Sequence, residues 1–145
     1  MNEFLTLFTR ASKLLREAAD QSMGQHGVRV GQNIVLEALW EEDGLTPGEV
    51  AGRIDVTTPT VVNTATRMEL AGLLERRPDP HDARLVRLFL TRRARAVRTA
   101  VERERDELEQ RATANLTPAE RRQLNAALRK IVRTLEGVPE ADRGA

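Results

Sequence analysis

Two threonine–proline pairs, Thr46-Pro47 and Thr58-Pro59, constrain the fold of this 145-residue chain more than any other feature. Such a pair is a typical helix start, because the threonine hydroxyl accepts from a free amide of the first turn and proline needs no partner there. At the first start, Glu49 is placed to bond back to the cap amide and complete a capping box. The second proline cannot continue the first helix, since it lacks the amide that the helix would use. The pattern predicts two short helices joined by a tight turn, with Thr58 as the cap of the second.

The second of these helices is predicted to run from Pro59 to about Ala71, because Gly72 offers the left-handed conformation in which many helices end. After this glycine the apolar spacing changes from a helical period to the period of a strand. Segments 73–77 and 85–90 flank a turn rich in proline and aspartate, and they predict a hairpin of two strands. Two short helices followed by a hairpin are the elements of a winged helix-turn-helix.

Apolar residues at three- and four-residue steps predict further helices on both sides of this segment. The first helix covers about 4–18, the second covers 34–40, a long polar helix covers 91–112, and a capping box at Thr117 starts the last. The first and last helices carry apolar stripes that so small a winged helix-turn-helix cannot cover. We expect the two to pack together and to be completed by a second copy of the chain, with pairing inside one chain as the alternative.

These elements predict a mainly α fold with a small β-hairpin wing, in which a winged helix-turn-helix is joined to a helical dimerisation region. The length suits one domain, residues 1–145. Within it we assign 1–30 and 113–137 to dimerisation helices, 31–91 to the winged helix-turn-helix and 92–112 to a long connecting helix.

Charge is distributed unevenly along the chain, although the net charge is only +1. Residues 1–56 have five basic and nine acidic side chains, whereas residues 76–98 have eight arginines and two aspartates. Such a basic segment is the electrostatic footprint of phosphate binding, although a solvated surface is the simpler interpretation of any charge run taken alone. We expect double-stranded DNA as the partner of this segment.

The composition argues against several classes of protein. Without cysteine there is no disulfide, thiolate metal site or thiol switch, and with only two histidines we expect no metal and no cofactor. No nucleophile–base grouping, phosphate loop or pair of catalytic carboxylates indicates an enzyme. No apolar run is long enough to span a membrane and no signal-peptide pattern opens the chain, so we expect a cytoplasmic protein.

Polar side chains of the second short helix are the main candidates for contact with DNA. Those that share one face, at steps of three and four residues, are Thr60, Asn63, Thr64 and Arg67. Short polar groups and arginine are the side chains that contact base edges and phosphates when a helix lies in the major groove. We add Thr57 and Thr58, at the start of the same helix, to these candidates.

The hairpin provides a second group of candidates, Arg77, His81 and Arg84, which could touch phosphates or a neighbouring minor groove. Asp82 is close enough in sequence to pair with Arg84 and brace the turn. For that arginine we hold the pairing and a DNA contact as equal alternatives.

The order of elements and several motifs resemble the multiple-antibiotic-resistance-regulator (MarR) family over nearly the whole chain. The matching segments are the leucine-rich first helix, Leu45–Ala51, Thr58–Asn63, Gly72–Arg76 and Asp79–Arg84 leading to Leu90-Thr91. The family's wing usually reads Asp-x-Arg-Asp-x-Arg, so His81 replaces the arginine that would probe the minor groove. The family also tends to place a glycine shortly after the Leu-Thr pair, where this chain has Arg92, Arg93 and Ala94. We therefore expect a local change at the start of the long helix.

The resemblance implies a homodimer that binds a pseudo-palindromic operator and represses nearby genes. It also implies a small-molecule effector, frequently aromatic, in a pocket between the dimer frame and the reader. Met23, Val30, Trp40 and Met68 are candidates for such a pocket, with ordinary core packing as the alternative for each. The main rival interpretation of the chain is a winged-helix protein-interaction module that does not bind DNA.

Overall fold

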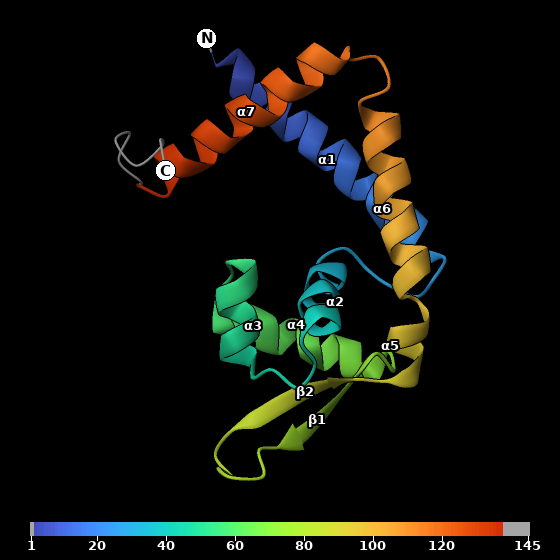
Figure 1. Ribbon diagram of the computed structural model, residues 1–145, viewed down its shortest axis with the longest axis vertical. Helices are drawn as coiled ribbons and strands as arrows, with labels where there is room; N and C mark the ends of the chain where they lie inside the picture. Colours follow the sequence, from blue (N-terminus) through green and yellow to red (C-terminus); the bar gives the residue numbers. More distant parts are fainter. Residues whose placement is uncertain (1, 138–145) are drawn as a thin grey trace. The chain divides into compact units, whose positions relative to one another are not determined.

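The computed structural model describes residues 2–137, and its elements follow the predicted order (Figure 1). They are α1 (Glu3–Gly24), α2 (Gln32–Glu41), α3 (Pro47–Ile54), α4 (Thr58–Leu70), β1 (Leu74–Pro78), β2 (Val86–Leu90), α5 (Arg92–Ala96), α6 (Arg98–Ala112) and α7 (Pro118–Leu135). The mainly α fold with one β-hairpin is confirmed. The chain divides into two compact units, residues 1–108 and 109–145, and the division falls within α6.

The predicted capping box at the start of α3 is present. The Thr46 hydroxyl accepts a hydrogen bond from the Glu49 amide at 3.2 Å, and the Glu49 carboxylate accepts one from the Thr46 amide, also at 3.2 Å. The hydrogen bond from the Thr46 amide, together with one from the Thr46 side chain, lowers the pKa of Glu49, because it stabilises the charged carboxylate. The local sequence is therefore sufficient to start this helix.

The cap of α4 is Thr57, so the prediction that Thr58 caps this helix was wrong by one residue. The Thr57 hydroxyl accepts from the Thr60 amide, and Thr58 is already helical. A cap at Thr58 would compete for the Val61 amide, which instead donates to the Thr57 carbonyl oxygen at 3.2 Å. The end of α4 agrees with the prediction, since Gly72 follows it with a φ of +76°.

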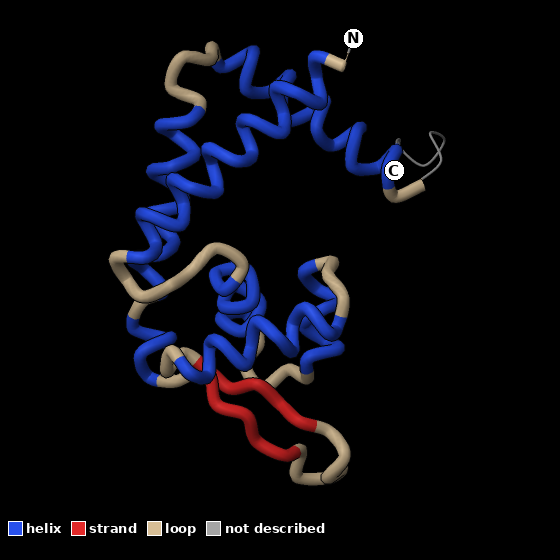
Figure 2. Tube along the Cα trace, turned by 180° about the vertical axis from the view of Figure 1, so that it is seen from behind, coloured by secondary structure: helices blue, strands red, loops and turns tan. Residues whose placement is uncertain are grey.

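The two strands form an antiparallel hairpin in which Leu74 lies opposite Leu90 (Figure 2). On the face of β2 that carries Val86, Leu88 and Leu90, the two leucines are buried, whereas Val86, next to the turn, is exposed. The Leu88 amide donates to the Leu45 carbonyl oxygen at 2.8 Å, which joins the hairpin to the start of the helix-turn-helix. Figure 2 shows the hairpin turn extending beyond the helices.

An apolar core within the first unit holds α2, α3, α4 and the hairpin together. Its largest fully buried side chains are Met23, Leu36, Leu39, Leu45, Met68, Leu73, Leu74 and Leu88. Trp40 is only half-buried, and its indole donates to the Ala94 carbonyl oxygen at 3.0 Å. Glu37 of α2 also forms an ion pair with Arg105 of α6.

The connecting segment is divided, not continuous as predicted over 92–112. The first helix, α5, ends in a cap at Val97, and α6 begins at Arg98. Val97 still donates its amide to Arg93 and accepts from the amide of Val101, so backbone hydrogen bonds continue through the break. The expected local change at the start of the long helix, relative to the family, stays a prediction.

The second unit contains α7, which begins with the predicted capping box of Thr117 and Glu120. None of the described residues of α7 is fully buried, and Leu124, Val132 and Leu135 are exposed. The predicted packing of the first and last helices stays a prediction. Over residues 2–137, no helix combines the length and the apolar character that a membrane span requires.

Candidate nucleic-acid interface

The helix α4 is anchored by one apolar stripe and exposes most of its remaining surface. Val61, Ala65 and Met68 are buried against the core. Of the predicted face, Thr60, Asn63 and Arg67 are exposed and Thr64 is half-buried. The described part of α4 has no acidic side chain before Glu69.

The two threonines at the start of α4 have different surroundings. The Thr57 hydroxyl accepts from the Thr60 amide and lies 2.9 Å from the Thr60 hydroxyl, so the side chains of Thr57 and Thr60 both belong to the cap. Thr58 is exposed in the first turn. Amide groups at a helix start carry partial positive charge, and this end of α4 is suited to a phosphate oxygen.

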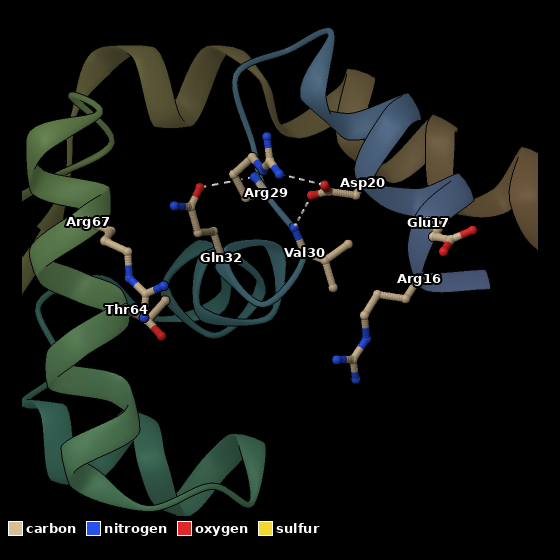
Figure 3. A pocket seen from close by; sticks show the side chains of 8 residues that line it. All are labelled: Arg16, Glu17, Asp20, Arg29, Val30, Gln32, Thr64 and Arg67. Atoms are coloured by element: carbon tan, nitrogen blue, oxygen red, sulfur yellow. Dashed lines mark hydrogen bonds and ion pairs between the residues drawn. The ribbon is translucent and has the colours of Figure 1, made fainter. Parts of the chain in front are cut away.

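Two of the predicted α4 residues also line a pocket of about 610 Å³ (Figure 3). The pocket residues are Arg16, Glu17, Asp20, Arg29, Val30, Gln32, Thr64 and Arg67. Asp20 holds the segment between α1 and α2 in place: it pairs with Arg29 at 2.7 Å and accepts from the Val30 amide at 3.1 Å. Figure 3 shows Arg67 on α4 on one side of the pocket and Arg16 on α1 on the other.

Of the four residues considered for an effector pocket, Val30 lines this one. Met23 and Met68 are core residues, and Trp40 is engaged with α5 through its indole. Sequence reasoning missed Arg16 and Arg29 of the pocket. Their only signal was that Arg16 and Arg29 are basic residues within an acidic N-terminal third.

The turn of the wing is organised by Asp79, whose side chain is only 8% exposed. Its carboxylate accepts from Arg87 Nε at 2.5 Å and from the amides of His81 at 2.7 Å and Asp82 at 2.8 Å. The hydrogen bond from Arg87 is the main reason that the pKa of Asp79 falls to about 2, and the same bond raises the pKa of Arg87. Asp79 is therefore charged throughout the neutral range.

Arg87 connects this turn to the helix-turn-helix. Its Nη1 donates to the Gly44 carbonyl oxygen at 2.9 Å and lies 3.4 Å from the Glu49 carboxylate. Sequence reasoning assigned no role to Arg87. No sequence signal connects it to Gly44, 43 residues away.

The three predicted wing residues are exposed but differ in their partners. Arg84 is 90% exposed and makes two hydrogen bonds to Asp82, at 3.1 and 3.2 Å, which lower the pKa of that aspartate. The brace between Asp82 and Arg84 is thus present. Arg77 pairs with Glu75 at 2.9 Å, and its guanidinium carbon lies 4.5 Å from the centre of the Phe89 ring.

Arg76, which had no predicted role, joins the hairpin to α4. Its Nη2 donates to the Val62 carbonyl oxygen at 3.0 Å and to the Thr66 hydroxyl at 2.8 Å. This arginine is therefore committed to contacts within the protein, and it orients α4 relative to β1.

Comparison with known proteins agrees with this arrangement. A family model described as the MarR family matches residues 26–85. The transcriptional regulator TtmR of Methylorubrum extorquens is 33% identical over 76 residues, which are 52% of this chain and 39% of TtmR. YybA of Bacillus subtilis, named as an uncharacterized HTH-type transcriptional regulator, is 21% identical over 94% of this chain and 91% of its own length.

Solved structures extend the similarity to both units. The S. aureus protein MepR, solved in complex with DNA, is 29% identical with a TM-score of 0.82, covering 90% of this chain and 97% of MepR. A mutant MarR from E. coli, solved with operator DNA, shares the fold with 23% identity and a TM-score of 0.80, covering 90% and 94% of the two chains. These similarities all point to one family: the MarR family model matches residues 26–85, and the structures of MepR and of the MarR mutant share the fold over 90% of the chain.

Proposed function

We propose that this chain is a sequence-specific, DNA-binding transcriptional regulator, with α4 as the recognition helix. The observation that carries the proposal is the surface of α4, where a buried stripe fixes the helix and Thr60, Asn63 and Arg67 stay exposed. A helix of this kind fits the major groove, and its positive N-terminal end favours phosphate. MepR and a MarR mutant, which have the same fold, were solved in complex with DNA.

The wing supplies the second contact in this proposal. Arg77 and His81 are exposed on a hairpin that Asp79 and Arg87 hold rigid, so they can meet a phosphate or a minor groove without much loss of conformational freedom. Arg84 keeps its ion pair with Asp82 in the free protein, and a DNA contact would compete with that pair.

We propose that the regulator acts as a homodimer on a pseudo-palindromic operator and represses nearby genes. Apolar side chains of α1 are exposed in the single chain, among them Leu5 by 58% and Leu7 by 59%. A second copy is the occupant expected for such a face, because a two-fold dimer presents two recognition helices to two half-sites. A regulator of this kind works in the cytoplasm and has no enzymatic activity.

The small-molecule effector is assigned to the pocket between α1 and α4, because Arg67 belongs both to the pocket and to the recognition helix. A ligand bound there would change the position of α4 directly. This assignment replaces the sequence-based candidates, of which Val30 is retained.

The rival function, a protein-interaction module without DNA binding, is separated by the response to salt. Contacts with phosphate release counterions and make affinity fall steeply with salt, whereas an apolar protein interface does not behave in this way. The decisive experiment is fluorescence anisotropy of the purified protein with DNA from upstream of its own gene, against scrambled DNA, at several salt concentrations.

We expect preferential binding to the upstream DNA with a steep salt dependence. Arg77→Ala should weaken binding to all sequences alike and reduce the salt slope by about one unit. Arg103→Ala, which removes an exposed arginine of α6, is the control and should leave the slope unchanged. No binding to any DNA at low salt would favour the protein-interaction module.

A further inference from the structure

Arg93, in the first turn of α5, contacts two segments that are distant from it in sequence. Its Nη1 donates to the Ala71 carbonyl oxygen at 2.7 Å, at the C-terminal cap of α4. Its guanidinium also lies against the backbone of Gly27, in the turn between α1 and α2. A methyl group on Gly27 would overlap Nη2 and come within 3.4 Å of Cζ. Arg93 thus bridges the end of the recognition helix and the α1–α2 turn.

The position of this arginine suits the end of a helix. The last carbonyl groups of a helix have no partner inside it and concentrate negative partial charge, so a cation there is stabilising. Thr91, the N-cap of α5, takes part as well: its hydroxyl donates to the Gly72 carbonyl oxygen at 2.7 Å. Two successive carbonyl groups at the end of α4 are therefore held by the start of α5.

The α1–α2 turn is also part of the pocket. Arg29 and Val30, which follow Gly27 by two and three residues, line it, and both are bonded to Asp20 of α1 (Figure 3). Any rearrangement of this turn is expected to change the fit between Gly27 and the Arg93 guanidinium, because no space for even a methyl group separates them.

We propose that Arg93 is a positioning residue that couples the α1–α2 turn to the recognition helix. It acts through the Ala71 carbonyl group and needs no contact with DNA. When the turn moves toward the guanidinium, Arg93 leaves Ala71, and the last turn of α4 loses its external support. The consequence for operator binding rests on the proposed function, whereas the coupling itself is a property of the free protein.

The test compares two ways of breaking the same contact. Arg93→Ala removes the guanidinium, and Gly27→Ala displaces it by adding a methyl group. Both Gly27 and Gly31 have positive φ, +77° and +94°, but a methyl group on Gly31 would meet nothing within 4 Å. Gly31→Ala is therefore the matched control for backbone strain in the same turn. Arg93→Lys keeps a charged donor for the single hydrogen bond to the Ala71 carbonyl oxygen and should rescue that contact.

The first measurement is amide hydrogen exchange in the protein without DNA. The amides of Ala71, Gly72 and Leu73 close the end of α4 by donating to carbonyl groups of that helix. We expect their exchange to rise about tenfold in Arg93→Ala and Gly27→Ala, the effect of losing one charge-assisted hydrogen bond. Exchange there should stay near the wild-type rate in Arg93→Lys and Gly31→Ala.

The second measurement is the ratio of affinities for operator and scrambled DNA, which should fall about tenfold in the same two variants. Two double variants complete the test, each combining Arg93→Ala with a glycine substitution. Adding Gly27→Ala should lower the affinity ratio further by no more than adding Gly31→Ala does. Fully additive losses, or unchanged exchange at the end of α4 in Arg93→Ala, would overturn the coupling. If wild-type protein prefers no DNA, the proposed function fails, and the exchange data still decide the role of Arg93.

Discussion

Asn63 and Arg67 stand one turn apart on α4, and their surroundings give them different roles. Asn63 is exposed, and its side chain is available to a base edge. Arg67 is exposed too, but it lines the pocket, and its Nε lies 3.5 Å from the Asn63 carbonyl oxygen. On this geometry we propose that Asn63 is the more direct reader of sequence, and that Arg67 can respond both to the pocket and to the operator.

Replacing either residue by alanine should weaken operator binding by about 1 to 3 kcal/mol, the value of a good contact to a base. Anisotropy titrations with operator and with scrambled DNA would measure the loss. Leu70→Ala, at an 85% exposed position at the other end of α4, serves as the control. Unchanged discrimination between the two DNAs would contradict the assignment of Asn63 and Arg67 as readers.

His81 occupies the wing position where relatives usually have arginine, and its backbone amide is fixed by Asp79 at 2.7 Å. His81→Arg should therefore strengthen DNA binding and steepen the salt slope by about one unit, because one more cation reaches a phosphate. His81→Asn, a neutral side chain on the same backbone, is the comparison. A slope that is equal in both variants would show that the wing tip stays away from the DNA backbone.

Among the elements, the hairpin owes its shape to one carboxylate. The Asp79 carboxylate accepts hydrogen bonds from two backbone amides and from Arg87. Arg87 also donates to the Gly44 carbonyl oxygen at the start of the helix-turn-helix. The wing and α3 are therefore joined by the ion pair of Arg87 and Glu49 in addition to the apolar core that they share. Such a joint is sensitive to acid.

The pKa of Asp79 is lowered from 3.8 to about 2 in the folded protein. A lowered folded-state pKa means that the charged carboxylate stabilises the fold above pH 4, and that this contribution is lost as the pH falls from about 4 to 2. Asp79→Asn should speed exchange of the His81 and Asp82 amides at pH 7. The difference from wild type should shrink over that acid range, when intrinsic exchange rates are corrected for pH. A difference that does not change with pH would exclude charge as its cause.

At the scale of the whole molecule, we expect the exposed apolar face of α1 to form part of the proposed homodimer interface. Phe4 and Phe8 lie one turn apart with ring centres 5.6 Å from each other, and they are 50% and 47% exposed. In a single chain this surface would stay in contact with water, which forgoes about half of the roughly 1.5 to 3 kcal/mol that full burial of a large apolar side chain contributes.

Phe8→Glu should therefore raise the dissociation constant of the homodimer at least about tenfold, because it removes apolar burial and adds a charge. Sedimentation velocity over a range of concentrations measures this change. Thr9→Glu, which adds the same charge to a polar position of α1, should leave the dimer intact. A wild-type protein that stays monomeric at all concentrations would remove the dimer from the proposed function.

The sequence alone determined those parts of the structure that depend on neighbouring residues. The capping boxes at Thr46 and Thr117, the stop at Gly72 and the alternation that buries Leu88 all involve side chains a few residues apart. Backbone preferences and local hydrogen bonds are sufficient there, so the order of elements and the exposed face of α4 could be predicted.

Only the tertiary structure decided which distant residues meet. Arg87 donates to the Gly44 carbonyl oxygen, and Arg93 contacts Ala71 and Gly27. Arg16 of α1 and Arg67 of α4 line the same pocket. An arginine has a long side chain with several donors, and its sequence neighbours do not say which carbonyl group or carboxylate it will reach. Burial of the shared core places α1, α4 and the hairpin around one another, and that placement selects these partners.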